Sequence, residues 1–190
     1  MGFNEMFKKR TEGALIQRSS ERTPFMCWFA GDARHPADPE ERFRHYATFS
    51  KGCFSPKEKQ MNISVFVDPD TDLPEWSVAA TDLDGSSICN ALSFYLDLKP
   101  CGQEDSGSKI GGGAHPIRGS QARRLEPVLT EKHLSFLMQI DEEDFFPPHA
   151  EGVDKWIRDA LCGGAIYVFA RIDTIEELIG ADVFIVDHQM

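Results

Sequence analysis

Short apolar segments separated by polar turns dominate the chain beyond residue 60, and this spacing limits the folds that it can adopt. In segment 61–68, Ile63, Val65 and Val67 occupy every second position, which is the side-chain period of a β-strand. The next apolar segment ends at Asp84-Gly85, a dipeptide typical of hairpin turns. The same reasoning predicts further strands at 76–85, 86–100, 133–141, 164–173 and 182–189, although the length of 86–100 leaves a helix open.

Helical patterns are fewer and shorter than the strand patterns. Residues 1–24 resemble an amphipathic helix with a loose tail. Asp38-Pro39 supplies a cap and a first turn and Gly52 supplies a stop, which predicts a helix between them. Two more short helices are expected at 153–162 and 174–180, the apolar run 24–31 is too short to assign, and the glycine-rich stretch 101–127 predicts a long loop.

These elements predict the fold class. Polar turns, rather than regularly spaced crossover helices, join many of the strands, which favours antiparallel pairing. We therefore expect a single α+β domain over residues 1–190, with a mostly antiparallel mixed sheet and a few short flanking helices. A chain of 190 residues that is 41% hydrophobic is long enough to bury one core.

The charge of the chain is acidic and unevenly distributed. Residues 1–60 carry 11 Lys and Arg against 8 Asp and Glu, a net charge of +3, whereas residues 61–190 carry 9 against 23, a net charge of −14. An acidic surface repels phosphate and attracts cationic proteins, so we expect a basic protein partner and no nucleic acid. Ordinary acidic solubility is the alternative explanation.

The compartment is predicted from what the sequence lacks. No apolar run approaches the roughly 20 residues that cross a bilayer, so no membrane association is expected, and the N-terminus has no secretory h-region. Five widely spaced cysteines form a poor disulfide framework, which suits free thiols in a reducing cytosol. We therefore expect a cytoplasmic protein whose oligomeric state the sequence leaves open.

Three segments in the C-terminal half resemble a known family. Ser108–Pro116 (SKIGGGAHP), Leu134–Asp141 (LSFLMQID) and Gly164–Phe169 (GAIYVF) resemble, in order, three motifs of the YwqG-like family of uncharacterised bacterial proteins. The resemblance covers about residues 105–172 and implies a mixed sheet with strands at 133–141 and 164–171. It implies no reaction, and some relatives resemble the small acidic immunity partners found beside bacterial toxins.

The glycine loop is one candidate binding site. Backbone N–H groups at Gly111, Gly112 and Gly113, next to Lys109, resemble a phosphate cradle, but neither nucleotide-loop motif is present. A sharp turn explains the glycines equally well. Gln139 and Asp141 extend this candidate pocket, because an amide inside an apolar strand needs partners, supplied either by a ligand or by the backbone of the loop.

The most distinctive local feature is an acidic run followed by aromatic residues. Glu142, Glu143 and Asp144 precede Phe145 and Phe146. Protein interfaces often combine an aromatic anchor with charged steering groups, so these five residues form a candidate partner interface. The structural alternative is an acidic helix start with both phenylalanines in the core.

Catalytic and metal-binding patterns are absent from the sequence. Asp68, Asp70 and Asp72 resemble the start of a calcium loop, but Leu73 and Ala79 stand where that loop needs glycine and glutamate. The six histidines form no HExxH motif, and no nucleophile elbow is present. We therefore expect no catalytic residues, no metal and no cofactor.

Two hypotheses remain. The first is a non-enzymatic protein-binding protein, an immunity or regulatory partner of a basic bacterial protein such as a toxin. The second is a small-ligand-binding domain or an enzyme of unknown reaction, with its pocket at glycine loop 111–113.

Overall fold

The structure is a computed structural model, and it describes residues 13–50, 53, 61–70, 75–101, 105–111, 127–129, 131–145, 156–157, 164–171 and 183–188.

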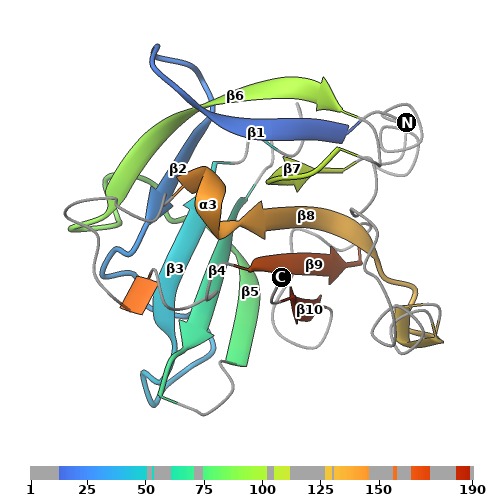
Figure 1. Ribbon diagram of the computed structural model, residues 1–190. Coiled ribbons are helices and arrows are strands. Elements are labelled where there is room, and N and C mark those ends of the chain that lie inside the picture. The colour runs from blue at the N-terminus through green and yellow to red at the C-terminus, as the bar shows by residue number, and fades with distance from the viewer. Residues whose placement is uncertain are drawn as a thin grey trace.

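Ten strands form one sheet in the described part of the chain (Figure 1). Their order is β10-β9-β8-β7-β1-β6-β2-β3-β4-β5, and each described pairing is antiparallel. The sheet curls so far that its two edge strands, β10 and β5, come into contact. The strands are β1 (Gly13–Ser19), β2 (Met26–Phe29), β3 (Arg44–Phe49), β4 (Asn62–Asp68), β5 (Glu75–Thr81), β6 (Leu92–Cys101), β7 (Lys109–Ile110), β8 (Ser135–Asp141), β9 (Ala165–Ala170) and β10 (Val183–His188).

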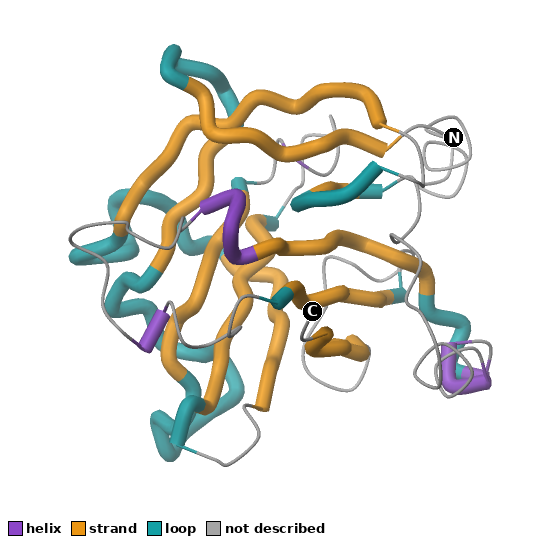
Figure 2. The backbone as a smooth tube through the Cα atoms, viewed as in Figure 1, coloured by secondary structure: helices purple, strands orange, loops and turns teal. Residues whose placement is uncertain are grey.

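The expectation of an α+β fold with flanking helices is wrong, because the described structure is mostly β (Figure 2). Helix α3 (Glu142–Phe145) is a single turn between β8 and the chain that follows it. The predicted helix between Asp38 and Gly52 is instead loop followed by β3. Its five consecutive buried residues, from His45 to Phe49, fit a strand that β2 and β4 border on both sides, and this pairing outweighs the local cap signal at Asp38.

A β-bulge at Tyr46 shifts the register of β3 against β4. His45 pairs with Phe66 and Ala47 pairs with Val65, so Tyr46 is the extra residue in β3. A bulge re-aims side chains locally. Tyr46 joins the main hydrophobic cluster with Phe49, while His45 contacts the Phe66 ring.

Three other segments differ from prediction. Residues 13–19, assigned to the N-terminal helix or tail, form β1 between β6 and β7, and residues 1–12 lie outside the described chain. The predicted loop 101–127 contains the short strand β7. In segment 86–100 the strand begins only at Leu92, because Ser86 and Ser87 donate to the Asp84 carboxylate in a turn and Asn90 has a positive φ of 59°.

The strands expected at 61–68, 76–85, 133–141, 164–173 and 182–189 are confirmed as β4, β5, β8, β9 and β10. Of the helices expected at 153–162 and 174–180, only residues 156–157 are described, and these are helical.

The main core fills one face of the curled sheet. Aromatic rings meet edge-on or tilted around Phe29, which contacts Tyr46, Phe49 and Phe145 with ring centroids 4.8–6.0 Å apart. Ile63, Val65 and Val67 of β4 face this core, as their alternation predicted. Ser64 and Phe66 face the opposite side, where loop residues 30–43 cover the sheet.

Candidate functional site

The predicted glycine-loop residues Lys109 and Gln139 do come together. They pair directly across β7 and β8, and Gln139 pairs in turn with Tyr167 of β9. Directly paired residues point to the same face, so the three polar side chains form a row across three strands. The row is buried, with Lys109 0% and Gln139 2% exposed.

The Lys109 ammonium is already engaged inside the protein. Its Nζ donates a hydrogen bond of 2.9 Å to the carbonyl oxygen of Asp105. A buried ammonium without partners would be costly, and this carbonyl offsets part of that cost. In the described structure, Lys109 is therefore enclosed by protein rather than open to a ligand.

Gly111 serves a turn rather than an anion cradle. Its φ is +67°, a left-handed conformation that favours glycine, and its N–H donates to the Leu137 carbonyl at 3.0 Å. Gly112 and Gly113 lie outside the described residues. The structural explanation of the glycines therefore accounts for Gly111.

Ser108 joins the glycine loop to the acidic turn. Its Oγ accepts a hydrogen bond from the Asp141 N–H at 2.8 Å and donates to the Asp141 carbonyl at 3.3 Å. Its own N–H donates to the Asp144 carboxylate, and Gly107, with a φ of +93°, leaves room for that carboxylate. We call this set of contacts among Gly107, Ser108, Asp141 and Asp144 the serine clamp.

Burial raises the pKa of the Asp141 carboxyl, and the nearby carboxylates of Asp144 and Glu143 raise it further. The N–H of Glu143 donates to Asp141 Oδ1 at 3.2 Å, which opposes that rise. Burial also raises the pKa of Tyr167, with a further contribution from Asp141. The carboxylates of this turn thus repel one another, and a cation placed beside them would relieve that repulsion.

The five residues of the predicted partner interface are divided between surface and core. Glu143 and Asp144 are exposed on α3. Phe145 is 1% exposed and packs against Phe29 and Phe49, so its ring belongs to the core and is no anchor for a partner. The side chain of Glu142 and all of Phe146 lie outside the described residues.

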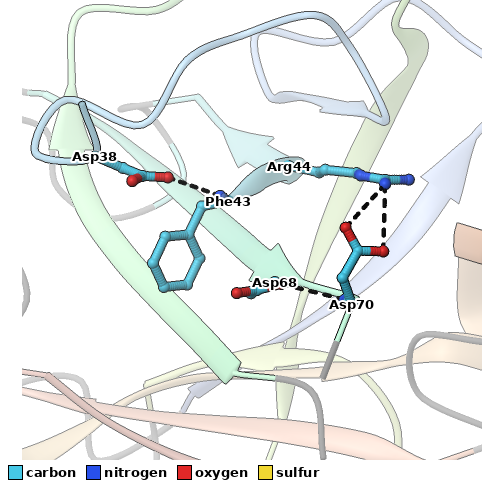
Figure 3. A network of polar contacts seen from close by, with 5 residues as sticks. All are labelled: Asp38, Phe43, Arg44, Asp68 and Asp70. Carbon is cyan, nitrogen blue, oxygen red and sulfur yellow. Dashed lines mark hydrogen bonds and ion pairs between the residues drawn. The ribbon is translucent and has the colours of Figure 1, made fainter. Parts of the chain in front are cut away.

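A cavity that the sequence gave no sign of lies at another place, beside the loop between β2 and β3. Its volume is about 370 Å³, and its walls come from residues 30–45 and from Trp156. Figure 3 shows part of its surroundings, with Asp38 accepting the Phe43 N–H at 2.7 Å and Arg44 paired with Asp70. No local motif marks this cavity, because Trp156 is remote in sequence from the loop that it faces.

Two histidines line this cavity, and both rings are held by hydrogen bonds. His35 Nδ1 accepts the Ala37 N–H at 3.1 Å and its Nε2 lies 2.8 Å from Ser77 Oγ. His45 Nδ1 accepts the Gly31 N–H at 3.1 Å and its Nε2 lies 2.7 Å from Thr48 Oγ1. An Nδ1 that accepts an N–H carries no proton, so each neutral ring is the Nε2–H tautomer and donates to the hydroxyl.

Behind His45 the hydroxyls continue as a buried chain. Thr48 Oγ1 lies 2.7 Å from Ser64 Oγ, which lies 2.7 Å from Thr81 Oγ1. Because His45 donates to Thr48, each hydroxyl can donate to the next one along β3, β4 and β5. Burial lowers the pKa of His45 to about 4 and also lowers that of His35. Both rings are therefore structural and neutral near pH 7.

Among the described residues, no group of three or more His, Cys, Asp or Glu side chains is arranged to hold a metal ion. No helix in the described part of the chain has the length and apolar character needed to span a bilayer.

No protein-family model, curated protein or solved structure matches this chain. The resemblance of residues 105–172 to the YwqG-like family therefore stays a prediction, and the function has to be argued from the residues themselves.

Proposed function

We propose that this protein is a non-enzymatic binding protein that engages a basic protein, as an immunity or regulatory partner does. The observation that carries the proposal is the acidic turn α3, which the serine clamp fixes on one side and the Phe145 ring fixes on the other. A preorganised surface loses little conformational freedom on binding, so more of its interaction energy appears as affinity.

The charge balance around α3 supports a cationic partner. Within the described residues, neither Glu143 nor Asp144 forms an ion pair with a lysine or arginine. Four ion pairs among the described residues join Arg34, Arg42 and Arg44 to carboxylates of the β2–β3 loop and of the end of β4. Carboxylates left without a cation add to the negative field of a chain with net charge −11, and such a field speeds the approach of a basic partner.

The cytoplasm is the compartment that we propose for this interaction. Cys27, Cys53, Cys89 and Cys101 are all free thiols in the described structure. Free thiols suit a reducing environment.

The alternative, a ligand pocket at glycine loop 111–113, has less support. Lys109 is enclosed and bonded to Asp105, and the Gly111 N–H is bonded to Leu137. Gln139 and Asp141 likewise lie within contacts of the sheet and the serine clamp. These groups would have to leave their present partners before they could hold a small anion.

The test compares two charge reversals of equal size. The variant Glu142→Lys/Glu143→Lys changes the acidic turn, and Glu21→Lys/Glu75→Lys makes the same change at exposed positions elsewhere. The partner is a basic protein that is recovered with this chain by pull-down from its native cell. Its association rate with each variant is measured by stopped flow between about 10 and 300 mM salt, a range over which the Debye length falls several-fold.

We expect the wild-type association rate to fall steeply with salt and the reversal at α3 to slow association about tenfold or more. The control variant should slow association much less. If the two variants behave alike, or if salt has no effect on a confirmed complex, the electrostatic role of α3 is wrong.

A further inference from the structure

The cavity beside the β2–β3 loop is large enough to hold one long side chain. Its volume of about 370 Å³ is near the lower end of the range typical of ligand pockets, about 300–1,000 Å³. It opens between loop residues of 30–43 and the indole of Trp156. One long side chain fits within this volume.

The charges around the cavity do not cancel. Arg34 pairs with Glu41 at 2.6 Å and Arg44 pairs with Asp70 at 3.3 Å, so both cations of the lining are already matched by carboxylates. Two further carboxylates of the lining, those of Asp32 and Asp38, form no ion pair with the described residues.

Both remaining carboxylates have uncharged hydrogen-bond donors as their partners. Asp32 accepts the side-chain amide of Asn90, and Asp38 accepts the backbone N–H of Phe43. The Phe43 N–H lowers the pKa of Asp38, with smaller contributions from the backbone N–H groups of Glu40 and Arg42 and from the charge of Arg42, so Asp38 is ionised at neutral pH. The described residues that line the cavity therefore carry an excess of negative charge.

Aromatic rings also line the cavity. The Phe43 ring stacks on His35 with centroids 5.2 Å apart, and the guanidinium of Arg44 lies 5.9 Å from the centroid of the Trp156 ring. Aromatic faces attract cations through the ring quadrupole. The chain thus already holds one guanidinium against the wall of this cavity, and the neutral histidines add no opposing charge.

We infer that this cavity binds one lysine or arginine side chain, contributed by the basic partner. The inference rests on the proposed function, and it adds a specific contact to the electrostatic steering by α3. Carboxylates beside an aromatic wall select a cation by charge, and the cavity volume admits one long side chain.

The test begins with probes that mimic single side chains. N-acetyl-arginine amide and N-acetyl-lysine amide carry one cation each, N-acetyl-glutamate amide carries an anion, and N-acetyl-glutamine amide is neutral. Binding is followed by calorimetry and by the NMR shift of the Trp156 indole N–H. We expect millimolar binding of a cationic probe and at least about tenfold weaker binding of the other two.

The matched variants are Asp38→Asn and Glu40→Gln. Each removes one negative charge, but Asp38 lines the cavity and Glu40 does not. An asparagine can still accept the Phe43 N–H, so the loop should keep its fold, and Asp32→Asn provides a second variant should Asp38→Asn fail to fold. We expect Asp38→Asn or Asp32→Asn to weaken the cationic probe about fivefold to tenfold and Glu40→Gln to leave it within about twofold.

The inference is overturned if no cationic probe binds, if the anionic probe binds more tightly, or if Asp38→Asn and Glu40→Gln have equal effects. The two proposals fail in different ways. If the complex weakens on charge reversal of α3 but tolerates Asp38→Asn and Asp32→Asn, the cavity inference is wrong and the proposed function stands. If the complex is insensitive to charge reversal of α3, the proposed role of the acidic turn is wrong, whether or not the cationic probes bind to the cavity.

Discussion

Ser108 and Asp141 exchange two hydrogen bonds, one in each direction, between a serine side chain and the backbone of another strand. One hydroxyl thereby joins the start of β7 to the end of β8, at the point where α3 begins. The same serine donates its backbone N–H to Asp144, so the orientation of the acidic turn depends on this residue.

Ser108→Ala should destabilise the protein by about 1–3 kcal/mol, because Asp141 would lose its partner at a buried position. Urea unfolding followed by circular dichroism measures the change. Ser86→Ala, at an exposed serine, is a control that should cost less. Equal losses in the two variants would show that the clamp contributes little.

Phe145→Ala should destabilise the protein by about 3–5 kcal/mol, because it opens a cavity beside Phe29 and Phe49. Phe145→Leu keeps most of the volume and should cost clearly less. The same unfolding experiment compares the two. An alanine variant with wild-type stability would place this ring outside the core and make it available to a partner.

His45 should make stability fall as the pH is lowered. Its pKa is about 4 in the folded protein and about 6.5 when unfolded, so the unfolded chain binds the proton more readily. The stabilisation is fully present above about pH 6.5 and is lost progressively down to about pH 4, by on the order of 3 kcal/mol. The NMR titration of the His45 ring should have its midpoint near pH 4.

His45→Gln removes the titrating group and should flatten the dependence of the unfolding free energy on pH across this window. His35 also has a lowered pKa, so part of the slope should remain. A slope unchanged by His45→Gln would mean that the ring is open to protons in the native state.

Thiol reactivity should separate one described cysteine from the others. Cys89 is exposed, whereas burial raises the pKa of Cys53 to about 11 and that of Cys27 as well. Because the thiolate is the reactive form, iodoacetamide at pH 8 should modify Cys89 first in a Cys162→Ser background. Peptide mass spectrometry measures the order, and rapid labelling of Cys27 or Cys53 would contradict the buried placement of these thiols.

Several strands were predictable because the evidence for them is local. Ile63, Val65 and Val67 alternate with residues of the opposite face, and period-two patterns place side chains regardless of the rest of the chain. The polar turns between such segments also indicated antiparallel neighbours, and each described pairing is antiparallel.

The stretch that ends in β3 was not predictable in the same way. Its cap at Asp38 is real, but the carboxylate accepts the N–H of Phe43 in a loop and starts no helix. Whether such a segment becomes helix or strand depends on the strands that border it, and those lie far away in sequence.

The sequence alone determined the positions of most strands, the excess of carboxylates and the absence of a catalytic motif. Tertiary packing decided that Phe145 belongs to the core, that Lys109 is enclosed, and that loop residues near Asp38 meet Trp156 around a cavity. The physical reason is that periodicity and charge are properties of neighbouring residues, whereas burial and cavities arise from contacts between segments that the chain order does not bring together.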